Sequence, residues 1–348
     1  MWLKKITLFN FRNFYEKSFN FSPFTTIILG ENAKGKTNIL EAIYCLAKGK
    51  GFREQKEVEL ITFDKTKAKI EGIVKEKDQQ FVYQILIEKN NNGIDKKYLI
   101  DKTKKSWRDF IRQSIKAVLF SPEQLKIING SPEERRNYFD RFLSEEDDEY
   151  RKKLINYVNA LKKRNKLLEV FTQKTDDFLE SLSFWNKYLI EQSVYLIEKR
   201  KKYCNFLNQN SFLEEKKFSI KYQPNIIDEK RLNLIFEEEI KQKKTLIGPQ
   251  RDNFLIFIKN EREKNIHHFG SRSEQRLALF WLKINEIRYI EEKYKIRPIL
   301  LLDDLFSELD TKNTRLILQL IKNYQVVLTT TDPEILKLIE GPKSIIVI

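Results

Sequence analysis

Residues 30–37 have the types and spacing of a phosphate-binding loop, matching the pattern G-x-x-x-x-G-K-[ST] at every fixed position. Glycines let such a loop curl so that backbone N–H groups point at phosphate oxygens, at the positive end of the following helix. We expect Lys36 to bridge the β and γ phosphates of a nucleotide, and the Thr37 hydroxyl to hold Mg²⁺. The expected nucleotide-binding residues are Gly30, Glu31, Asn32, Ala33, Lys34, Gly35, Lys36, Thr37 and Asn38.

A second group of chemically competent residues follows an apolar run far along the chain. Residues 298–302 read as a buried strand, and Asp303 and Asp304 come directly after it. P-loop ATPases complete their metal site with a carboxylate at the end of such a strand. We therefore expect Asp303 to hold Mg²⁺ opposite Thr37, and Asp304 to act catalytically with Lys36 by orienting or activating the attacking water.

Local sequence patterns predict the strands and helices that position these residues. A short β-strand over 25–29 precedes the loop, and residues 38–47 follow with the apolar spacing of a helix. Alternating runs predict strands at 3–9, 67–74, 81–88 and 97–100, with hairpin turn chemistry at 91–93, and later strands at 325–330 and 344–348. Between them, residues from about 121 to 210 carry long, charged helical patterns.

The order of the remaining motifs is that of ABC-type ATPases. In such proteins a signature segment binds the γ-phosphate of the opposite subunit's ATP, so that ATP holds a dimer together. The expected signature residues are Ser271, Arg272, Ser273, Gln275 and Arg276. An S-x-L-D loop supplies Ser307 and Asp310, and Thr330 and Thr331 follow the last core strand as a switch.

The chain resembles the RecF family over essentially its whole length. The resemblance rests on the motifs above and on Leu3-Lys4, 10–13, 120–123, 130–136, Asp140 and Gly248-Pro249-Gln250-Arg251-Asp252. It implies an α/β fold, namely a P-loop ABC-type ATPase head (1–120 plus 245–348) with an inserted, mostly helical lobe (121–244). It also implies ATP and Mg²⁺ as ligands and an ATP-dependent homodimer on duplex DNA or single-strand/double-strand junctions. Slow hydrolysis would release this clamp. The resemblance further implies action at single-strand gaps, RecR as a partner, and help to RecO and RecR in loading RecA.

Three positions depart from the family pattern. The signature usually resembles S-Q-G-Q-Q-R, whereas Ser273 here stands in place of glycine, flanked by Arg272 and Glu274. In the Gly-Pro motif, Gln250 replaces the usual histidine, and Asn253 stands where an acid is common. The contact between the signature and a γ-phosphate is therefore expected to be altered.

Several basic residues have two interpretations. Arg12 and Asn13 are expected to contact the nucleotide, because related heads place this early turn beside it; alternatively, Arg12 is a turn arginine paired with an acid. Arg135 and Arg136 have the pattern of a helix start and contact either the protein's own acids or an external group. His267 and His268 lie near no further ligand cluster and receive no role.

Composition limits the classes of function. The net charge of +15 indicates a polyanionic partner or a lysine-rich genome, and residues 151–205, with 13 Lys/Arg against 6 Asp/Glu, form either a DNA contact or a solvated helix face. Two isolated cysteines and no apolar run of about 18 residues favour a cytoplasmic protein without a membrane partner. The chain shows no membrane-coupling segment of a transporter subunit, no insert long enough for the arms of an SMC protein, and no separate acidic cluster of a nuclease fusion. The alternative that the chain is a structural DNA-binding protein with a vestigial nucleotide site remains open.

Overall fold

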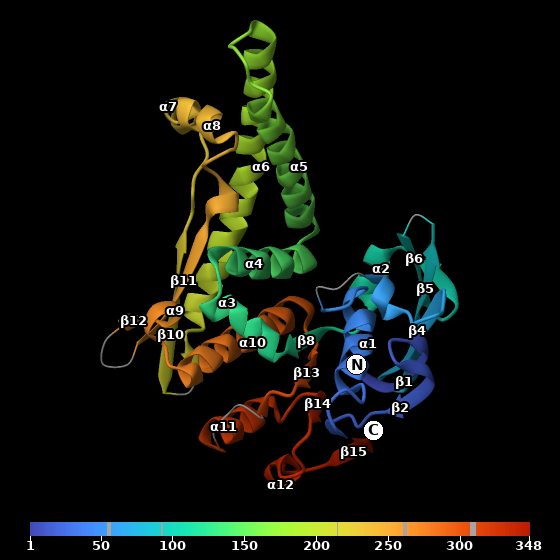
Figure 1. Ribbon diagram of the computed structural model, residues 1–348. Coiled ribbons are helices and arrows are strands. Elements are labelled where there is room, and N and C mark those ends of the chain that lie inside the picture. Colours follow the sequence, from blue (N-terminus) through green and yellow to red (C-terminus); the bar gives the residue numbers. More distant parts are fainter. Residues whose placement is uncertain (54–56, 92, 214, 260–262, 307–310) are drawn as a thin grey trace. The chain divides into compact units, whose positions relative to one another are not determined.

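The structure is a computed structural model that describes residues 1–53, 57–91, 93–213, 215–259, 263–306 and 311–348 (Figure 1). Its contacts divide the chain into two compact units. Unit 1 combines Met1–Glu123 with Lys283–Ile348, and unit 2 is Gln124–Leu282. Within the described ranges, no helix has the length and apolar character needed to cross a bilayer.

A five-stranded parallel sheet forms the centre of unit 1, with the order β15-β3-β14-β13-β8. The strands are β3 (Thr25–Leu29), β8 (Ala117–Phe120), β13 (Ile299–Asp303), β14 (Val326–Thr330) and β15 (Lys343–Val347). All residues of β13 and β14 are buried, which explains why these strands read as continuous apolar runs rather than alternating ones. The carboxyl ends of β3 and β13 deliver the phosphate-loop segment and the two aspartates to the same edge of the sheet.

A six-stranded antiparallel sheet, ordered β2-β1-β4-β5-β6-β7, completes the core of unit 1. Its strands are β1 (Trp2–Phe11), β2 (Phe14–Asn20), β4 (Lys67–Glu76), β5 (Gln79–Asn90), β6 (Gly93–Ile100) and β7 (Thr103–Lys105). Helix α1 (Lys36–Lys48) packs on this sheet through Leu46. An added Cβ at Gly72 would lie 2.5 Å from the Leu46 Cδ1 atom, so this glycine permits the close approach of helix and strand.

Shorter elements surround these sheets in unit 1. They are η1 (Glu57–Leu60), α2 (Trp107–Gln113), η2 (Pro122–Leu125, which reaches the unit boundary), α11 (Thr311–Ile321) and α12 (Ile335–Leu338). Helix α10 (Arg272–Tyr294) contains the division between the units.

Unit 2 combines a helical hairpin with a second antiparallel sheet. Its helices are α3 (Lys126–Asn129), α4 (Pro132–Glu146), α5 (Asp148–Glu169), α6 (Asp176–Gln209), α7 (Glu229–Leu234), α8 (Phe236–Gln242), η3 (Pro249–Arg251) and α9 (Ile266–Phe269). The sheet has the order β12-β11-β10-β9 and consists of β9 (Phe212–Leu213), β10 (Lys216–Gln223), β11 (Asn253–Lys259) and β12 (Glu263–Asn265). The long helices α5 and α6 run side by side, with Arg164 donating to Asn186 at 2.7 Å.

The boundary of this unit differs from the one that the sequence predicts. The change from helical to strand patterns suggests that the head resumes at residue 245, whereas the structure groups residues 245–282 with unit 2. The reason is the continuous register from Lys217↔Lys259 to Gln223↔Asn253, which pairs β11 with β10. The inserted lobe is therefore not only helical, because a sheet lies beside its helices.

Candidate nucleotide-binding site

The phosphate-loop segment lies between β3 and α1, as its motif requires, and two of its glycines are needed by geometry. Gly35 has φ +103°, and a Cβ there would come within 2.6 Å of the Asn13 side chain. A Cβ on Gly30 would lie 2.4 Å from the carbonyl oxygen of Ile348. The loop therefore tolerates side chains at neither end without rearrangement.

Lys36 is held by the loop itself. Its ammonium donates to the carbonyl oxygens of Gly30 at 2.7 Å and Glu31 at 2.8 Å, so the loop curls around the charge. Helix α1 begins at Lys36, has no acidic residue in its first turn and receives no side-chain cap from Gly35. The positive end of the helix thus has no carboxylate of its own in that turn, which suits an incoming phosphate.

The expected metal ligands lie together. The Thr37 hydroxyl donates to the Asp303 Oδ1 atom at 2.9 Å, joining the start of α1 to the end of β13. A second hydroxyl, from Thr329 on β14, donates to the same oxygen at 2.8 Å and accepts from the Asp304 backbone N–H at 3.0 Å. Burial raises the pKa of Asp303, although both hydroxyls oppose the shift by stabilising its anion.

This pair fits Mg²⁺ in chemical type. Magnesium is usually held by one or two protein oxygens together with substrate phosphates, rather than by a cage of protein ligands. Across the described residues, no group of three or more His, Cys, Asp or Glu side chains is placed to hold a metal ion. A hydroxyl and a carboxylate beside the phosphate loop therefore match a metal that arrives with a nucleotide.

A cavity of about 500 Å³ joins the phosphate loop to the acidic strand. It is lined by Asn32, Ala33, Gly35, Lys36, Thr37, Asn38, Phe52, Arg53, Ser121, Pro122, Glu123, Asp303, Asp304 and Thr329. Arg53 and Phe52, from the segment after α1, and Thr329 were not among the expected site residues. Motif spacing could not locate Arg53, which the fold brings close enough to oppose the raised pKa of Asp303.

Arg12 and Asn13 occupy the turn beside the loop in different ways. The Arg12 guanidinium makes two hydrogen bonds to the fully buried Glu41 carboxylate on α1, at 2.8 and 3.0 Å. This is the pairing with an acid that the alternative interpretation describes; a nucleotide contact by Arg12 remains a prediction. Asn13 donates to the Lys34 carbonyl at 3.2 Å and accepts from the Asn38 amide at 2.8 Å, and so connects the turn to the phosphate loop and to α1.

The residues expected to form a switch are placed outside the lining of the 500 Å³ cavity. The Thr330 hydroxyl accepts from the Asp332 N–H at 3.0 Å, closing a local turn. Thr331 lines a second, more open cavity of about 590 Å³, together with Gly30 and Ile348. Ser307 and Asp310, predicted to form the S-x-L-D loop, lie outside the described residues.

The signature segment begins helix α10 with a reciprocal cap. Glu274 N–H donates to the Ser271 hydroxyl at 3.3 Å, and the Ser271 N–H donates to the Glu274 carboxylate at 2.8 Å. Lys264 forms an ion pair with the same carboxylate at 2.8 Å. Burial alone would raise the pKa of Glu274, but the Lys264 and Ser271 hydrogen bonds outweigh it and the pKa is lowered. The helix start therefore already holds an anion supplied by the chain.

The other signature residues surround this cap. The Gln275 amide donates to the Gly270 carbonyl at 3.2 Å and accepts from Asn129 at 3.4 Å. Arg272 is exposed, whereas Ser273 and Arg276 are half-buried. The capping carboxylate of Glu274 thus lies at the start of the helix, among the expected signature residues.

Comparison with known proteins gives consistent results. The family model described as the RecF/RecN/SMC N terminal domain matches residues 2–346. "DNA replication and repair protein RecF" of Agathobacter rectalis is 33% identical over 346 residues, covering 95% of this chain and 92% of the relative. The protein of the same name from Natranaerobius thermophilus is also 33% identical, over 361 residues that cover 96% and 92% of the two chains.

Solved structures extend the similarity to the fold. A structure described as the recombination mediator protein RecF with ATP in the RecFOR pathway has a TM-score of 0.81 at 30% identity, covering 95% of this chain and 92% of the other. The SMC head domain of Pyrococcus furiosus has a TM-score of 0.53 at 16% identity, covering 97% and 92%, and so shares the fold alone. These similarities confirm the predicted α/β ABC-type fold, and the chain belongs to the RecF family of DNA replication and repair proteins.

Proposed function

We propose that this chain is an ATP-dependent DNA-binding recombination mediator, in which ATP joins two copies into a clamp on DNA and slow hydrolysis releases it. The observation that carries the proposal is the cavity in which Lys36, Thr37 and Asp303 converge from two motifs 266 positions apart. The RecF-with-ATP structures and the RecF relatives support the same assignment.

Nucleotide binding would replace contacts within the phosphate loop by contacts to the nucleotide. The Lys36 ammonium carries three donors, two of which are directed at the Gly30 and Glu31 carbonyls. On binding, Lys36 would turn toward the β and γ phosphates, while loop N–H groups and the start of α1 receive the remaining oxygens. Thr37 and Asp303 would hold Mg²⁺, which supplies charge neutralisation on the phosphate oxygens.

Hydrolysis would depend on Asp304. This residue follows Asp303 with φ +44°, and its backbone N–H is fixed by the Thr329 hydroxyl. That anchoring sets the direction of the carboxylate beside the cavity, where it would orient a water molecule toward the γ-phosphate. Closure of the site would require the Ser271 segment of a second copy, so turnover should rise with protein concentration and with DNA.

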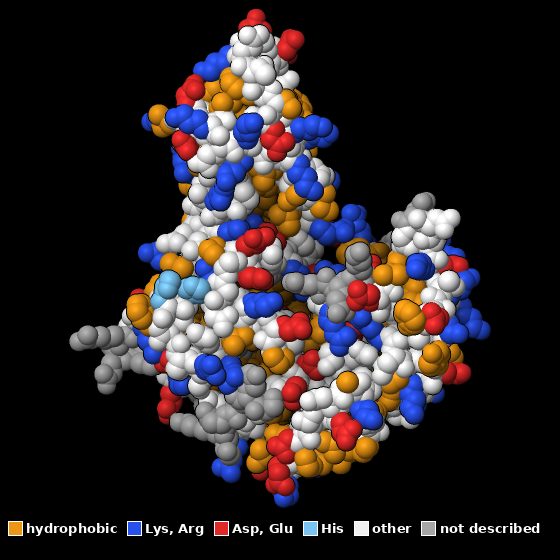
Figure 2. All heavy atoms as spheres, viewed as in Figure 1, with side chains coloured by type: hydrophobic (Ala, Val, Ile, Leu, Met, Phe, Trp, Pro, Cys, Tyr) orange, Lys and Arg blue, Asp and Glu red, His pale blue; other side chains and the backbone are white. Residues whose placement is uncertain are grey.

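DNA binding would rest on phosphate contacts. The excess of 65 Lys and Arg over 50 Asp and Glu favours a polyanion, and Figure 2 shows Lys and Arg side chains spread over the visible face rather than gathered in one patch. Affinity should therefore fall steeply with salt and depend little on sequence. RecR would be a direct partner in the cytoplasm, with RecO and RecA in the same pathway.

Titration with a fluorescent ATP analogue and Mg²⁺ tests the nucleotide site directly. Wild type should bind and Lys36→Ala should not, because the substitution removes the phosphate-bridging cation. Lys67→Ala is the control for loss of a lysine, since Lys67 is exposed, pairs with Glu88 on the neighbouring strand and does not line the cavity. Equal binding by Lys36→Ala and wild type would instead support a structural DNA-binding protein with a vestigial site.

A further inference from the structure

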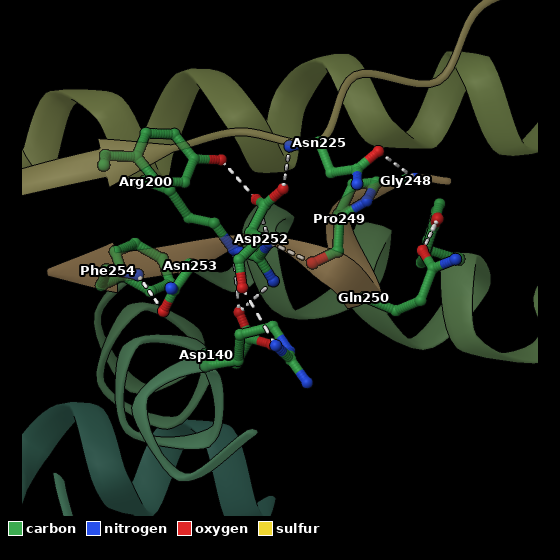
Figure 3. A network of polar contacts seen from close by, with 12 residues as sticks. Asp140, Arg200, Asn225, Gly248, Pro249, Gln250, Asp252, Asn253 and Phe254 are labelled. Atoms are coloured by element: carbon green, nitrogen blue, oxygen red, sulfur yellow. Dashed lines mark hydrogen bonds and ion pairs between the residues drawn. The ribbon is translucent and has the colours of Figure 1, made fainter. Parts of the chain in front are cut away.

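The segment Gly248-Pro249-Gln250-Arg251-Asp252 in unit 2 lies on a buried network of charges (Figure 3). Arg200, on α6, is fully buried and donates to Asp252 at 2.6 Å and to Asp140 at 2.7 Å. It also donates to the Pro249 carbonyl at 2.9 Å. One guanidinium therefore ties the segment to two other elements of the same unit.

Further contacts fix the backbone before Arg251. Gly248 has φ +121°, and an added Cβ would lie 2.3 Å from the Tyr157 hydroxyl oxygen. The Gly248 N–H donates to the Asn225 side chain at 3.2 Å. Gln250, in the place of the family's histidine, accepts from the Tyr157 hydroxyl and donates to the Ile247 carbonyl at 2.8 Å.

The residue after Arg251 is fixed equally well. Asp252 is fully buried and, besides Arg200, accepts from the Asn225 N–H at 2.6 Å and from the Tyr222 hydroxyl. The backbone on both sides of Arg251 is thus held in one conformation, and a side chain on such a support loses little freedom when it binds a partner.

Arg251 itself differs from its neighbours. Its side chain is exposed, and among the residues that the structure describes it has no hydrogen-bond or ion-pair partner. An arginine remains charged at any physiological pH, and its planar guanidinium matches a phosphate with two parallel hydrogen bonds. The network therefore displays one unpaired cation from a rigid turn.

Two more arginines increase the positive charge beside this turn. Arg136 donates to the Asp252 carbonyl at 3.0 Å. Among the described residues, the buried Arg135 donates to neutral oxygens alone, those of Asn253 at 3.1 and 3.3 Å and of Gly130 at 2.9 Å. Burial and the nearby Arg136 charge both lower the pKa of Arg135. Because Asn253 stands where the family commonly has an acid, the positive charge of Arg135 is not matched at this point.

We propose that Arg251 is a contact for one backbone phosphate of DNA, displayed by the buried network and reinforced by the charge of Arg135 and Arg136. The inference rests on the proposed DNA-binding function and assigns part of the surface that performs it. Phosphate is favoured over a base edge because the neighbouring amide side chains of Gln250 and Asn253 bond within the unit. The guanidinium of Arg251 alone provides charge but little sequence information.

The test compares the salt dependence of duplex DNA binding, by fluorescence anisotropy with ATP and Mg²⁺, between wild type and Arg251→Ala. Loss of one phosphate contact should lower the slope of log K against log salt by about 1 and weaken binding about fivefold at 0.15 M salt. Arg251→Lys should retain most of the slope. Lys230→Ala, an exposed cation on α7, is the control for loss of charge alone.

Asn253→Asp supplies a second, independent perturbation, because it adds a negative charge beside Arg135 without changing Arg251. It should weaken DNA binding and leave ATP-analogue binding unchanged. If Arg251→Ala and Lys230→Ala bind DNA with the wild-type slope and affinity, the inference is overturned while the proposed function stands. If wild type binds no DNA at all, both are overturned.

Discussion

Two glycine-containing turns in this chain bring charged side chains together, and they use them in opposite ways. At the phosphate loop of unit 1, the Lys36 ammonium bonds to backbone carbonyls beside a cavity, and each bond can be exchanged for one to a ligand. At the Gly248 turn of unit 2, the Arg200 charge is matched by the buried carboxylate of Asp252 and the half-buried carboxylate of Asp140. The difference separates a site built to receive the charge of a ligand from a network whose own charges are already matched and which stabilises the fold around it.

Removing the cation of the buried network should have the largest effect on stability. Arg200→Ala leaves Asp140 and Asp252 without their shared partner, and breaking a buried pair in this way costs about 3–5 kcal/mol. The free energy of unfolding, measured by urea titration with circular dichroism, should fall by that amount. A loss below about 1 kcal/mol would show that the network is not structural and would weaken the contrast with the phosphate loop.

The matching change at the phosphate loop should leave stability almost intact and remove activity. Lys36→Arg keeps the charge but lacks the compact ammonium that the loop surrounds. Hydrolysis, measured by phosphate release, should fall on the order of 10²- to 10³-fold, with the free energy of unfolding within about 0.5 kcal/mol of wild type. A variant that unfolds, or that hydrolyses ATP at the wild-type rate, would contradict this assignment.

The cap formed by Ser271 and Glu274 combines features of the phosphate loop and of the buried network. It is a structural contact, but it lies at a position expected to bind phosphate. Glu274→Gln retains the capping pattern, which accepts glutamine as well as glutamate, but removes the negative charge and the ion pair with Lys264. We expect ATP-driven dimerisation at roughly five- to tenfold lower ATP concentration, because a carboxylate no longer repels the γ-phosphate. Light scattering at graded ATP concentrations measures the midpoint, and an unchanged or higher midpoint would exclude this role for Glu274.

The smallest effect on stability is expected at Gln250, the position in the buried network where the family usually has a histidine. Gln250→His should change the free energy of unfolding by no more than about 1 kcal/mol, because an imidazole nitrogen can also accept from the Tyr157 hydroxyl. Gln250→Leu should cost about 1–3 kcal/mol, since that buried hydroxyl would lose its acceptor. Similar thermal melts for the two variants would show that the Tyr157–Gln250 hydrogen bond contributes little.

The sequence predicted the parts of the fold whose pattern is local. The strand over 25–29 has the same bounds as β3, and Lys36, Thr37 and Asp303 meet as their motifs require. Phosphate-loop and acidic-strand motifs are short, and their elements are buried parallel strands with unbroken apolar runs. The pairing of Thr37 with Asp303 was also expected from chemistry, because a Mg²⁺ ion that arrives with a nucleotide would need both oxygens.

Residues that long-range packing brings to the site were not predictable. Arg53 and Thr329 reach the cavity because their segments pack beside α1 and β13, and neither belongs to a motif in the phosphate loop or acidic strand. The sheet of unit 2 was missed for the same reason, since β10 pairs with a strand about 40 residues further along the chain. The pairing of Arg12 with Glu41 on α1 also depends on packing between distant segments, so the sequence offered it only as one of two interpretations.

The central claim is that ATP controls assembly through a site shared by two copies, and sedimentation of wild type with ATP and Mg²⁺, with and without duplex DNA, tests it most directly. Lys36→Arg and Ser271→Arg, measured alongside, alter the two halves of that site. We predict a dimer that forms only with ATP and is lost in both variants. A monomer under every condition, with DNA binding indifferent to ATP, would contradict the account.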